Sequence, residues 1–176
     1  MREMTIRPAD IAEVPALHAL IESAYRGESA TKGWTHESYL LGGQRTDPET
    51  LTAIINSPTS AILVAEGAPG LWGCVQISNA GNGLGYLGLL AVDPTLQAAG
   101  IGSLLIVAAE QALAHNYHCS RVEMTVINLR SELIAYYERR GYIATGEVRP
   151  FPYDDERFGV PQSPNLDFVV LEKAIE

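Results

Sequence analysis

The sequence predicts an α/β domain built on a mixed sheet with helices on its faces. The main observation is the order of elements, because strand-like apolar runs alternate with helical patterns through the second half of the chain. The composition agrees, since a chain that is 47% hydrophobic and 19% charged can bury a core. The length of 176 residues suits one unit. We therefore expect residues 1–176 to form a single domain.

The first third of the chain predicts a short strand and two helices. Thr5-Ile6-Arg7 is the strand, and Asp10 is a helix cap. The apolar face expected for the first helix comprises Ile11, Val14, Leu17, Ile21 and Tyr25. Residues 26–45 are expected to form a loop with a short helix near Ser38. The second helix runs to about Ile55, and either Thr46 caps it with Glu49 reaching back, or Asp47 caps it with Pro48 in the first turn.

The rest of the chain supplies most of the sheet. Residues 61–65 and 71–78 are expected to form a hairpin, with Cys74 as a buried small side chain in its second strand. Further strands are expected at 86–92, 121–126, 143–148 and 168–171. A helix at 102–114 should place Ile101, Leu104, Leu105 and Ala108 on its inner side. A helix at 131–140 should stop at Gly141, a residue suited to a left-handed cap.

Charge and composition exclude several classes of function. The formal net charge is −9 and no cluster of Lys and Arg is present, so we expect no nucleic-acid partner. No apolar run approaches the roughly 18 residues of a membrane helix, and the N-terminus has no signal-peptide pattern. We therefore expect a cytoplasmic protein without a membrane partner. Cys74 and Cys119 have no metal-ligand spacing, so no metal is expected.

One segment has the features of a phosphate-binding turn. An apolar strand ends at Asp93-Pro94, and the small residues of 97–102 then lead directly into a helix. Unpaired N–H groups and the partial positive charge of a helix N-terminus favour phosphate. Leu105 stands where a dinucleotide fingerprint needs its third glycine, and the Gly-Lys-Ser/Thr of a P-loop is absent. A tight strand-to-helix turn without any ligand explains the pattern equally well.

Two motifs resemble those of a known family. Gln97-Ala98-Ala99-Gly100-Ile101-Gly102 resembles the Gln/Arg-x-x-Gly-x-Gly/Ala pyrophosphate loop of the GNAT superfamily of N-acyltransferases. Tyr137-Glu138-Arg139-Arg140-Gly141-Tyr142 is similar to the family's Tyr-Glu-Lys/Arg-x-Gly-Phe/Tyr segment. The likeness covers residues 61–146 and implies a mostly antiparallel central sheet of six to seven strands with helices on both faces.

The resemblance also implies a co-substrate, acetyl-CoA, and the residues that contact it. The backbone of Leu90, Ala91 and Val92 would pair with the pantetheine arm, and an N–H of Leu90 or Ala91 would face the thioester oxygen. The family's asparagine position is occupied here by Arg130, and the nearest asparagine is Asn128, so both are candidate cofactor contacts. The N–H groups expected to hold the pyrophosphate belong to Gln97, Ala98, Ala99, Gly100, Ile101, Gly102 and Ser103.

Two residues are the candidates for proton transfer. Tyr137 would donate a proton to the departing thiolate, although its helical position alone would favour a core aromatic residue. Alternation places Val122, Met124 and Val126 on one face of their strand and Glu123 on the other. Glu123 would relay the amine proton through water, or it is an ordinary ion-paired strand residue. Glu37 and Tyr86 are further candidates for the base.

The acceptor is expected to bind between two variable segments. Trp34, Tyr39 and Arg45 lie in the first, and Tyr153 lies in the second. The acidic residues 154–156 would attract a cationic amine, or they form a solvated loop. The family likeness implies transfer of an acetyl group to a small-molecule primary amine by direct attack, and a homodimer as a family-level expectation. The alternatives are a protein or peptide N-acetyltransferase and a non-catalytic acyl-CoA-binding module.

Overall fold

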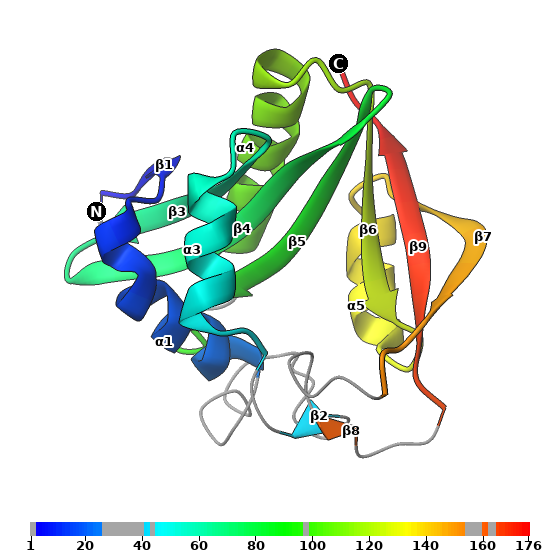
Figure 1. Cartoon of the computed structure of the whole chain (residues 1–176), viewed down its shortest axis with the longest axis horizontal. Helices are drawn as coiled ribbons and strands as arrows, with labels where there is room; N and C mark the ends of the chain where they lie inside the picture. Colours follow the sequence, from blue (N-terminus) through cyan, green and yellow to red (C-terminus); the bar gives the residue numbers. More distant parts are fainter. Residues whose placement is uncertain (1–2, 26–40, 43–44, 97–98, 154–159, 162–164) are drawn as a thin grey trace.

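The centre of the molecule is a seven-stranded sheet with strand order β1-β3-β4-β5-β6-β9-β7 (Figure 1). The computed structural model describes residues 3–25, 41–42, 45–96, 99–153, 160–161 and 165–176. Within these residues β2 (Leu41–Gly42) and β8 (Val160–Pro161) form a separate two-stranded sheet. The strands of the main sheet are β1 (Thr5–Pro8), β3 (Ser60–Gly67), β4 (Gly70–Gly81), β5 (Leu84–Val92), β6 (Arg121–Ile127), β7 (Ile143–Pro150) and β9 (Asp167–Ala174).

Helices cover both faces of this sheet (Figure 1). The first face packs against α1 (Val14–Tyr25) and α3 (Pro48–Asn56), and α1 is preceded by a 3₁₀ turn, η1 (Ile11–Glu13). The other face packs against α4 (Ile101–Asn116) and α5 (Ser131–Glu138). Alternate residues of β3 serve the two cores, since Ile62 packs with α1 whereas Leu63 packs with α4. Only the β5–β6 pair is parallel, so the predicted mixed, mostly antiparallel sheet is confirmed.

A β-bulge interrupts β5 just before the strand ends. Cys74 pairs with Ala91 and Gln76 pairs with Gly88, so Leu89 and Leu90 together oppose a single residue of β4. Leu89 has φ +48°, which is a left-handed conformation that a branched side chain rarely adopts. The bulge reverses the alternation of the strand, because Leu87 packs with α4 whereas Leu89 and Ala91 pack with α1.

The sheet splits between its two central strands. The pairing of β5 with β6 covers only Leu84–Tyr86 and Arg121–Glu123, and the strands diverge after that (Figure 1). From Leu87 onward the edge of β5 that faces β6 therefore makes no ladder contact with it. The divergence opens a cleft at the C-terminal end of β5, directly before α4 begins.

Most predicted elements appear at the expected positions, and two details of side-chain burial are wrong. Ile11 is 45% exposed because it lies in the 3₁₀ turn. This turn has three residues per repeat, so Ile11 points away from the buried face of α1. Leu104 is 49% exposed because it lies outside the buried face of α4. This face comprises Ile101, Leu105, Ile106 and Ala109. The other predicted faces are confirmed, and Cys74 is a fully buried free thiol.

The contacts at the N-terminus of α3 show which of the two predicted caps, Thr46 or Asp47, is formed. The N–H of Thr50 donates to Asp47 Oδ1 at 2.7 Å, and Pro48 occupies the first turn. Asp47 is therefore the cap, and Thr46 is buried instead. Across the described part of the chain, no helix has the length and apolar character needed to span a membrane.

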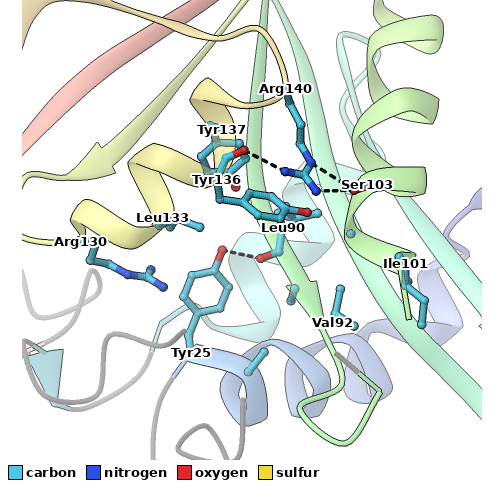
Figure 2. Close-up of a pocket in the computed structure, with 14 residues that line it drawn as sticks. Tyr25, Leu90, Val92, Ile101, Ser103, Arg130, Leu133, Tyr136, Tyr137 and Arg140 are labelled. Atoms are coloured by element: carbon cyan, nitrogen blue, oxygen red, sulfur yellow. Dashed lines mark hydrogen bonds between the residues drawn. The ribbon is translucent and has the colours of Figure 1, made fainter. Parts of the chain in front are cut away.

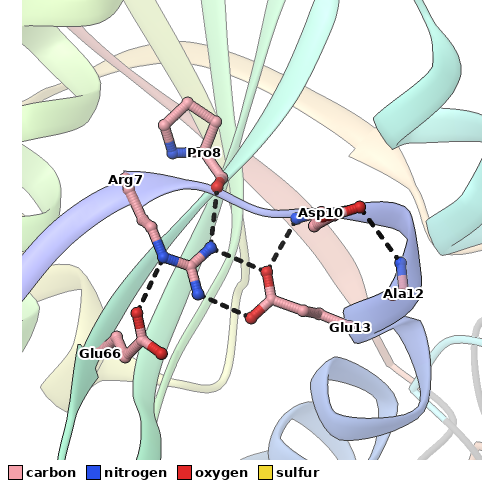
Figure 3. Close-up of polar contacts among 6 residues, drawn as sticks. All are labelled: Arg7, Pro8, Asp10, Ala12, Glu13 and Glu66. Carbon is pink, nitrogen blue, oxygen red and sulfur yellow. Dashed lines mark hydrogen bonds and ion pairs between the residues drawn. The ribbon is translucent and has the colours of Figure 1, made fainter.

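An ion cluster ties β1 to the start of α1 and to β3 (Figure 3). Arg7 donates from Nη1 and Nη2 to the two oxygens of Glu13, each at 2.8 Å, and from Nε to Glu66 at 2.8 Å. Glu13 also accepts from the N–H of Asp10, which completes a capping box. The hydrogen bonds from Arg7 lower the pKa of Glu13 from its ordinary value of 4.5 to about 2.

Replacing Glu13 with glutamine should lower the free energy of unfolding at pH 7 by about 1–2 kcal/mol, after allowance for partial exposure of the pair. Because the pKa is lower in the folded state, the ionised form stabilises the protein above pH 4.5 and this contribution fades as pH falls toward 2. Urea unfolding at pH 7 and pH 3 should show the difference roughly halved at pH 3. Glu138→Gln, at an exposed position, is the matched control. A difference of equal size at both pH values would contradict the ionic explanation.

Candidate active site

Two cavities meet where β5 and β6 separate. The first, here called the loop cavity, measures about 270 Å³ and lies between the end of β5, the start of α4 and α5 (Figure 2). The second, the strand cavity, measures about 550 Å³ and lies between the diverging strands and α3. Both cavities are lined by Tyr25, Leu90, Arg130, Leu133 and Tyr137. These shared residues mark the point at which two bound molecules would touch.

The wall of the loop cavity includes the N-terminus of α4. Gly100 has φ +79° at the N-cap position, a conformation that favours glycine, and no described side chain caps this end. Gly100, Ile101, Gly102 and Ser103 line the cavity, whereas Ala99 is exposed outside its lining. Gln97 and Ala98 lie outside the described residues. Uncapped N–H groups at a helix start form a site that suits an anion.

A fixed cation lies beside this helix start. Arg140 donates from Nη2 and Nε to Ser103 Oγ at 2.6 and 3.1 Å, and from Nη1 to the carbonyl oxygen of Tyr136 at 2.9 Å (Figure 2). Its guanidinium also lies 3.5 Å from the ring centroid of Tyr136. Sequence reasoning did not select Arg140, although it lies one helical turn after Tyr136 inside the second motif.

Gly102 allows α5 to approach α4 closely. A Cβ atom at this position would lie 3.0 Å from Tyr136 Oη, which is tighter than almost any ordinary contact. The missing side chain therefore makes room for the Tyr136 ring, and this ring in turn supports Arg140. Glycine here serves the packing of the cavity wall as well as the approach of a ligand.

The open edge of β5 forms the floor of the loop cavity. Leu90, Ala91 and Val92, which were predicted to contact the cofactor, all line this cavity. Tyr25, the last residue of α1, donates its hydroxyl to the carbonyl oxygen of Leu90 at 2.6 Å (Figure 2). Tyr25 was predicted only as part of the apolar face of its helix, and nothing in the sequence indicates a partner on β5.

Tyr137 lies at the junction of the two cavities. It is 5% exposed, and its ring makes edge contacts with Tyr136 and Tyr142 at centroid distances of 5.4 and 5.9 Å. None of the described residues forms a hydrogen bond with its hydroxyl. Burial raises the pKa of Tyr137 above its ordinary value of 10, and the charge of Arg130 only partly opposes this. The hydroxyl therefore stays protonated at neutral pH and is available as a proton donor.

Arg130 and Asn128, the two candidate cofactor contacts near the start of α5, have different positions. Arg130 is 4% exposed and lines both cavities, with its Nε 3.9 Å from Glu132 Oε1. Asn128 lines neither cavity. Its amide donates to the carbonyl oxygen of Asn165 and accepts from the N–H of Asp167, both at 3.1 Å. The structure thus brings Arg130 into the site and uses Asn128 to fasten β9.

Glu123 lies outside the lining of both cavities. It is 8% exposed, and its two oxygens accept from Arg149 at 3.1 and 3.2 Å. The hydrogen bonds from Arg149 to Glu147 and Glu123 raise the pKa of the arginine. This geometry is that of an ion-paired strand residue, one of the two interpretations that the sequence allowed.

The acceptor-site candidates and the two further base candidates, Glu37 and Tyr86, divide in a similar way. Trp34, Tyr39, Glu37 and residues 154–156 lie outside the described residues. Tyr153 is 40% exposed and lies outside both linings, where its hydroxyl accepts from the N–H of Leu166 at 2.6 Å. Arg45 and Tyr86 line the strand cavity. Phe151, which belongs to the same predicted segment as Tyr153, also lines it, as does Phe168, which sequence reasoning did not select.

Comparisons with known proteins agree with this geometry. A family model described as the acetyltransferase (GNAT) domain matches residues 36–151. The solved ribosomal-protein-S18-alanine N-acetyltransferase from Escherichia coli superposes with a TM-score of 0.72 at 14% identity, covering 99% of this chain and 95% of that one. A GNAT family acetyltransferase from Elizabethkingia anophelis with acetyl-CoA bound gives 0.69 at 17% identity, covering 98% of each chain.

An IAA acetyltransferase from Bacillus cereus has the same TM-score of 0.69 at 16% identity, covering 98% of this chain and 100% of that one. No curated protein matches the sequence. At these identities the solved structures show the fold, and the family model shows the kinship. The chain belongs to the GNAT family of acetyltransferases.

Proposed function

We propose that the protein transfers the acetyl group of acetyl-CoA to the primary amine of a small molecule by direct attack. The observation that carries this proposal is the junction at Tyr137, where a cavity suited to an anion meets a second cavity large enough for a small acceptor. Each cavity would hold one reactant, and only the shared residues would touch both. Holding two reactants in one geometry supplies much of the rate of such a transfer.

The loop cavity would bind acetyl-CoA. The N–H groups from Gly100 to Ser103 would receive the diphosphate, with the charge of Arg140 beside them. The edge of β5 at Leu90–Val92 would pair with the two amides of the pantetheine arm. The Elizabethkingia anophelis structure, which has the same fold, contains bound acetyl-CoA, and this supports acetyl-CoA as the co-substrate.

The chemistry needs no covalent enzyme intermediate. The neutral amine nitrogen attacks the thioester carbon and the C–N bond forms. The nitrogen then releases its extra proton to water, and the C–S bond breaks. An N–H of Leu90 or Ala91, directly after the bulge at Leu89, would stabilise the oxygen that becomes negative. Tyr137 would protonate the departing thiolate and recover its proton from solvent.

The experiment that tests the proposal is an acceptor panel with acetyl-CoA and a free-thiol readout. We expect thiol release with small primary amines and slower release with peptides that present a free N-terminus. Faster turnover of the peptides would overturn the small-molecule assignment. If no acceptor released thiol above the enzyme-free rate, while calorimetry showed acetyl-CoA binding, the protein would be a binding module and the proposed reaction would be wrong.

The pH dependence of kcat/KM should follow the pKa of the acceptor amine. No Asp, Glu or His is among the described residues that line either cavity, so the amine would lose its proton to water before it attacks. We expect kcat/KM to rise about tenfold per pH unit up to the pKa of the acceptor amine. No fall should follow below pH 10, because burial raises the pKa of Tyr137 above that value.

Two acceptors of different basicity test this expectation, since the midpoint of the profile should move with the amine. An identical midpoint for both acceptors would indicate a base on the enzyme. In that case Glu123→Gln tests whether Glu123 is this base. Loss of the low-pH limb of the kcat/KM profile would assign the role to Glu123, and an unchanged limb would exclude it.

A further inference from the structure

The described lining of the strand cavity has a charge opposite to that of the whole chain. The sequence has 12 Lys and Arg against 21 Asp and Glu, for a net charge of −9. The described residues that line the strand cavity nevertheless include two arginines, Arg45 and Arg130, and no carboxylate. A cavity of this sign in an acidic protein would attract an anionic group and repel a purely cationic one.

Arg130 brings its positive charge to the reaction centre. Its side chain is buried and lines both cavities, as Tyr137 does. Figure 2 shows it extending from the start of α5 toward Tyr25. A charge in such a desolvated position interacts strongly with a bound carboxylate, because water screens it little.

The backbone of Arg45 is anchored to α1, and its side chain lies beside Tyr25. Glu22 of α1 accepts from the N–H of Arg45 at 2.7 and 3.0 Å and from the N–H of Thr46 at 2.9 Å. The guanidinium lies 5.0 Å from the ring centroid of Tyr25. Tyr25 thus lies beside Arg45, and Arg130 extends toward the same ring.

The remainder of the strand cavity is part polar, at Thr46, Thr50, Gln76, Tyr86 and Thr125, and part apolar or aromatic. Its lining includes Leu89, Met124, Ile127, Phe151 and Phe168. These side chains suit the apolar body of an acceptor of modest size, since small-molecule cavities of roughly 300–1,000 Å³ are usual. The cavity therefore combines a cationic end at the reaction centre with an apolar wall.

We infer that the acceptor is an α-amino acid with an apolar or aromatic side chain, whose carboxylate is bound by Arg130 and Arg45. This inference rests on the proposed transfer to a small-molecule amine. Because Arg130 lies at the junction of the cavities, the anionic group must sit close to the attacking nitrogen, as the carboxylate of an α-amino acid does. The apolar side chain then points toward Phe151 and Phe168.

Matched acceptor pairs test the inference by changing only the carboxylate. L-phenylalanine is compared with phenethylamine, and L-leucine with 3-methylbutylamine, with each rate corrected for the fraction of unprotonated amine at the assay pH. We expect kcat/KM to be about 10- to 100-fold higher for the amino acid of each pair, the range for hydrogen bonds to a charged group. Equal values, or a preference for the amines, would overturn the inference and leave the proposed transfer standing.

An arginine variant tests which side chain binds the carboxylate of the acceptor. In Arg45→Gln the ratio between amino acid and amine should fall toward one, whereas the exposed Arg121→Gln should keep the ratio of the unmodified protein. Thermal unfolding of both variants checks that each remains folded. A ratio that is unchanged in Arg45→Gln would remove Arg45 from the inference. Absence of thiol release with all four acceptors would overturn both the inference and the proposed function.

Discussion

Replacing Tyr137 with phenylalanine is expected to lower kcat about 100-fold at neutral pH and to leave the affinity for acetyl-CoA within about a factor of two. The change removes one hydroxyl at the junction, and this hydroxyl forms no hydrogen bond with a described residue, whereas the hydroxyl of Tyr25 donates to the carbonyl oxygen of Leu90. The ring keeps its edge contacts with Tyr136 and Tyr142. The effect should therefore appear in the chemical step, because the thiolate must then leave without a neighbouring acid.

Thiol release at saturating acetyl-CoA measures kcat, and calorimetry with acetyl-CoA measures affinity. Tyr142→Phe is the matched control, since Tyr142 is equally buried but lines neither cavity. Its hydroxyl donates to Glu110 at 2.9 Å, so the control should lower the free energy of unfolding by about 1–2 kcal/mol without slowing turnover. An unchanged kcat in Tyr137→Phe would remove this residue from the mechanism. Equal losses in both variants would indicate a structural effect.

Features that depend on neighbours in the sequence could be predicted. Asp10 and Glu13 form a capping box whose spacing is visible in the chain, although the sequence analysis selected only Asp10. Gly141 has φ +95°, as a residue that ends a helix in the left-handed conformation must. The alternation along residues 121–127 correctly placed Val122, Met124 and Val126 in the core with α4. In each case one short segment contains all the information that the local structure needs.

Features that depend on packing between distant segments could not be predicted. Tyr25 meets Leu90 across 65 positions of sequence, and Arg140 meets Ser103 across 37. Such contacts follow from how α1 and α5 lie on the sheet, and neither arrangement has a local signature. The bulge at Leu89 is similar, because a left-handed leucine has no sequence signal of the kind that glycine gives. The site is therefore less visible in the sequence than the fold.

Replacing Arg140 with glutamine is expected to raise KM for acetyl-CoA about 10- to 100-fold and to change kcat little. The guanidinium is fixed on the wall of the loop cavity by Ser103 and by the ring of Tyr136. It would add a charge-assisted bond to the diphosphate at the N-terminus of α4. This bond is remote from the thioester, so it should contribute equally to the ground state and the transition state, which is the pattern that changes KM alone.

A truncated acetyl donor distinguishes binding of the diphosphate by Arg140 from a structural role of this residue. S-acetylpantetheine lacks the diphosphate, so the unmodified protein and Arg140→Gln should use it with the same kcat/KM. Arg139→Gln is the matched control, because Arg139 is the adjacent exposed arginine and lines neither cavity. If Arg140→Gln lost as much activity with S-acetylpantetheine as with acetyl-CoA, Arg140 would act by supporting Ser103 and Tyr136. If Arg139→Gln raised KM equally, the effect would be one of general surface charge, and no direct bond to the diphosphate would be needed.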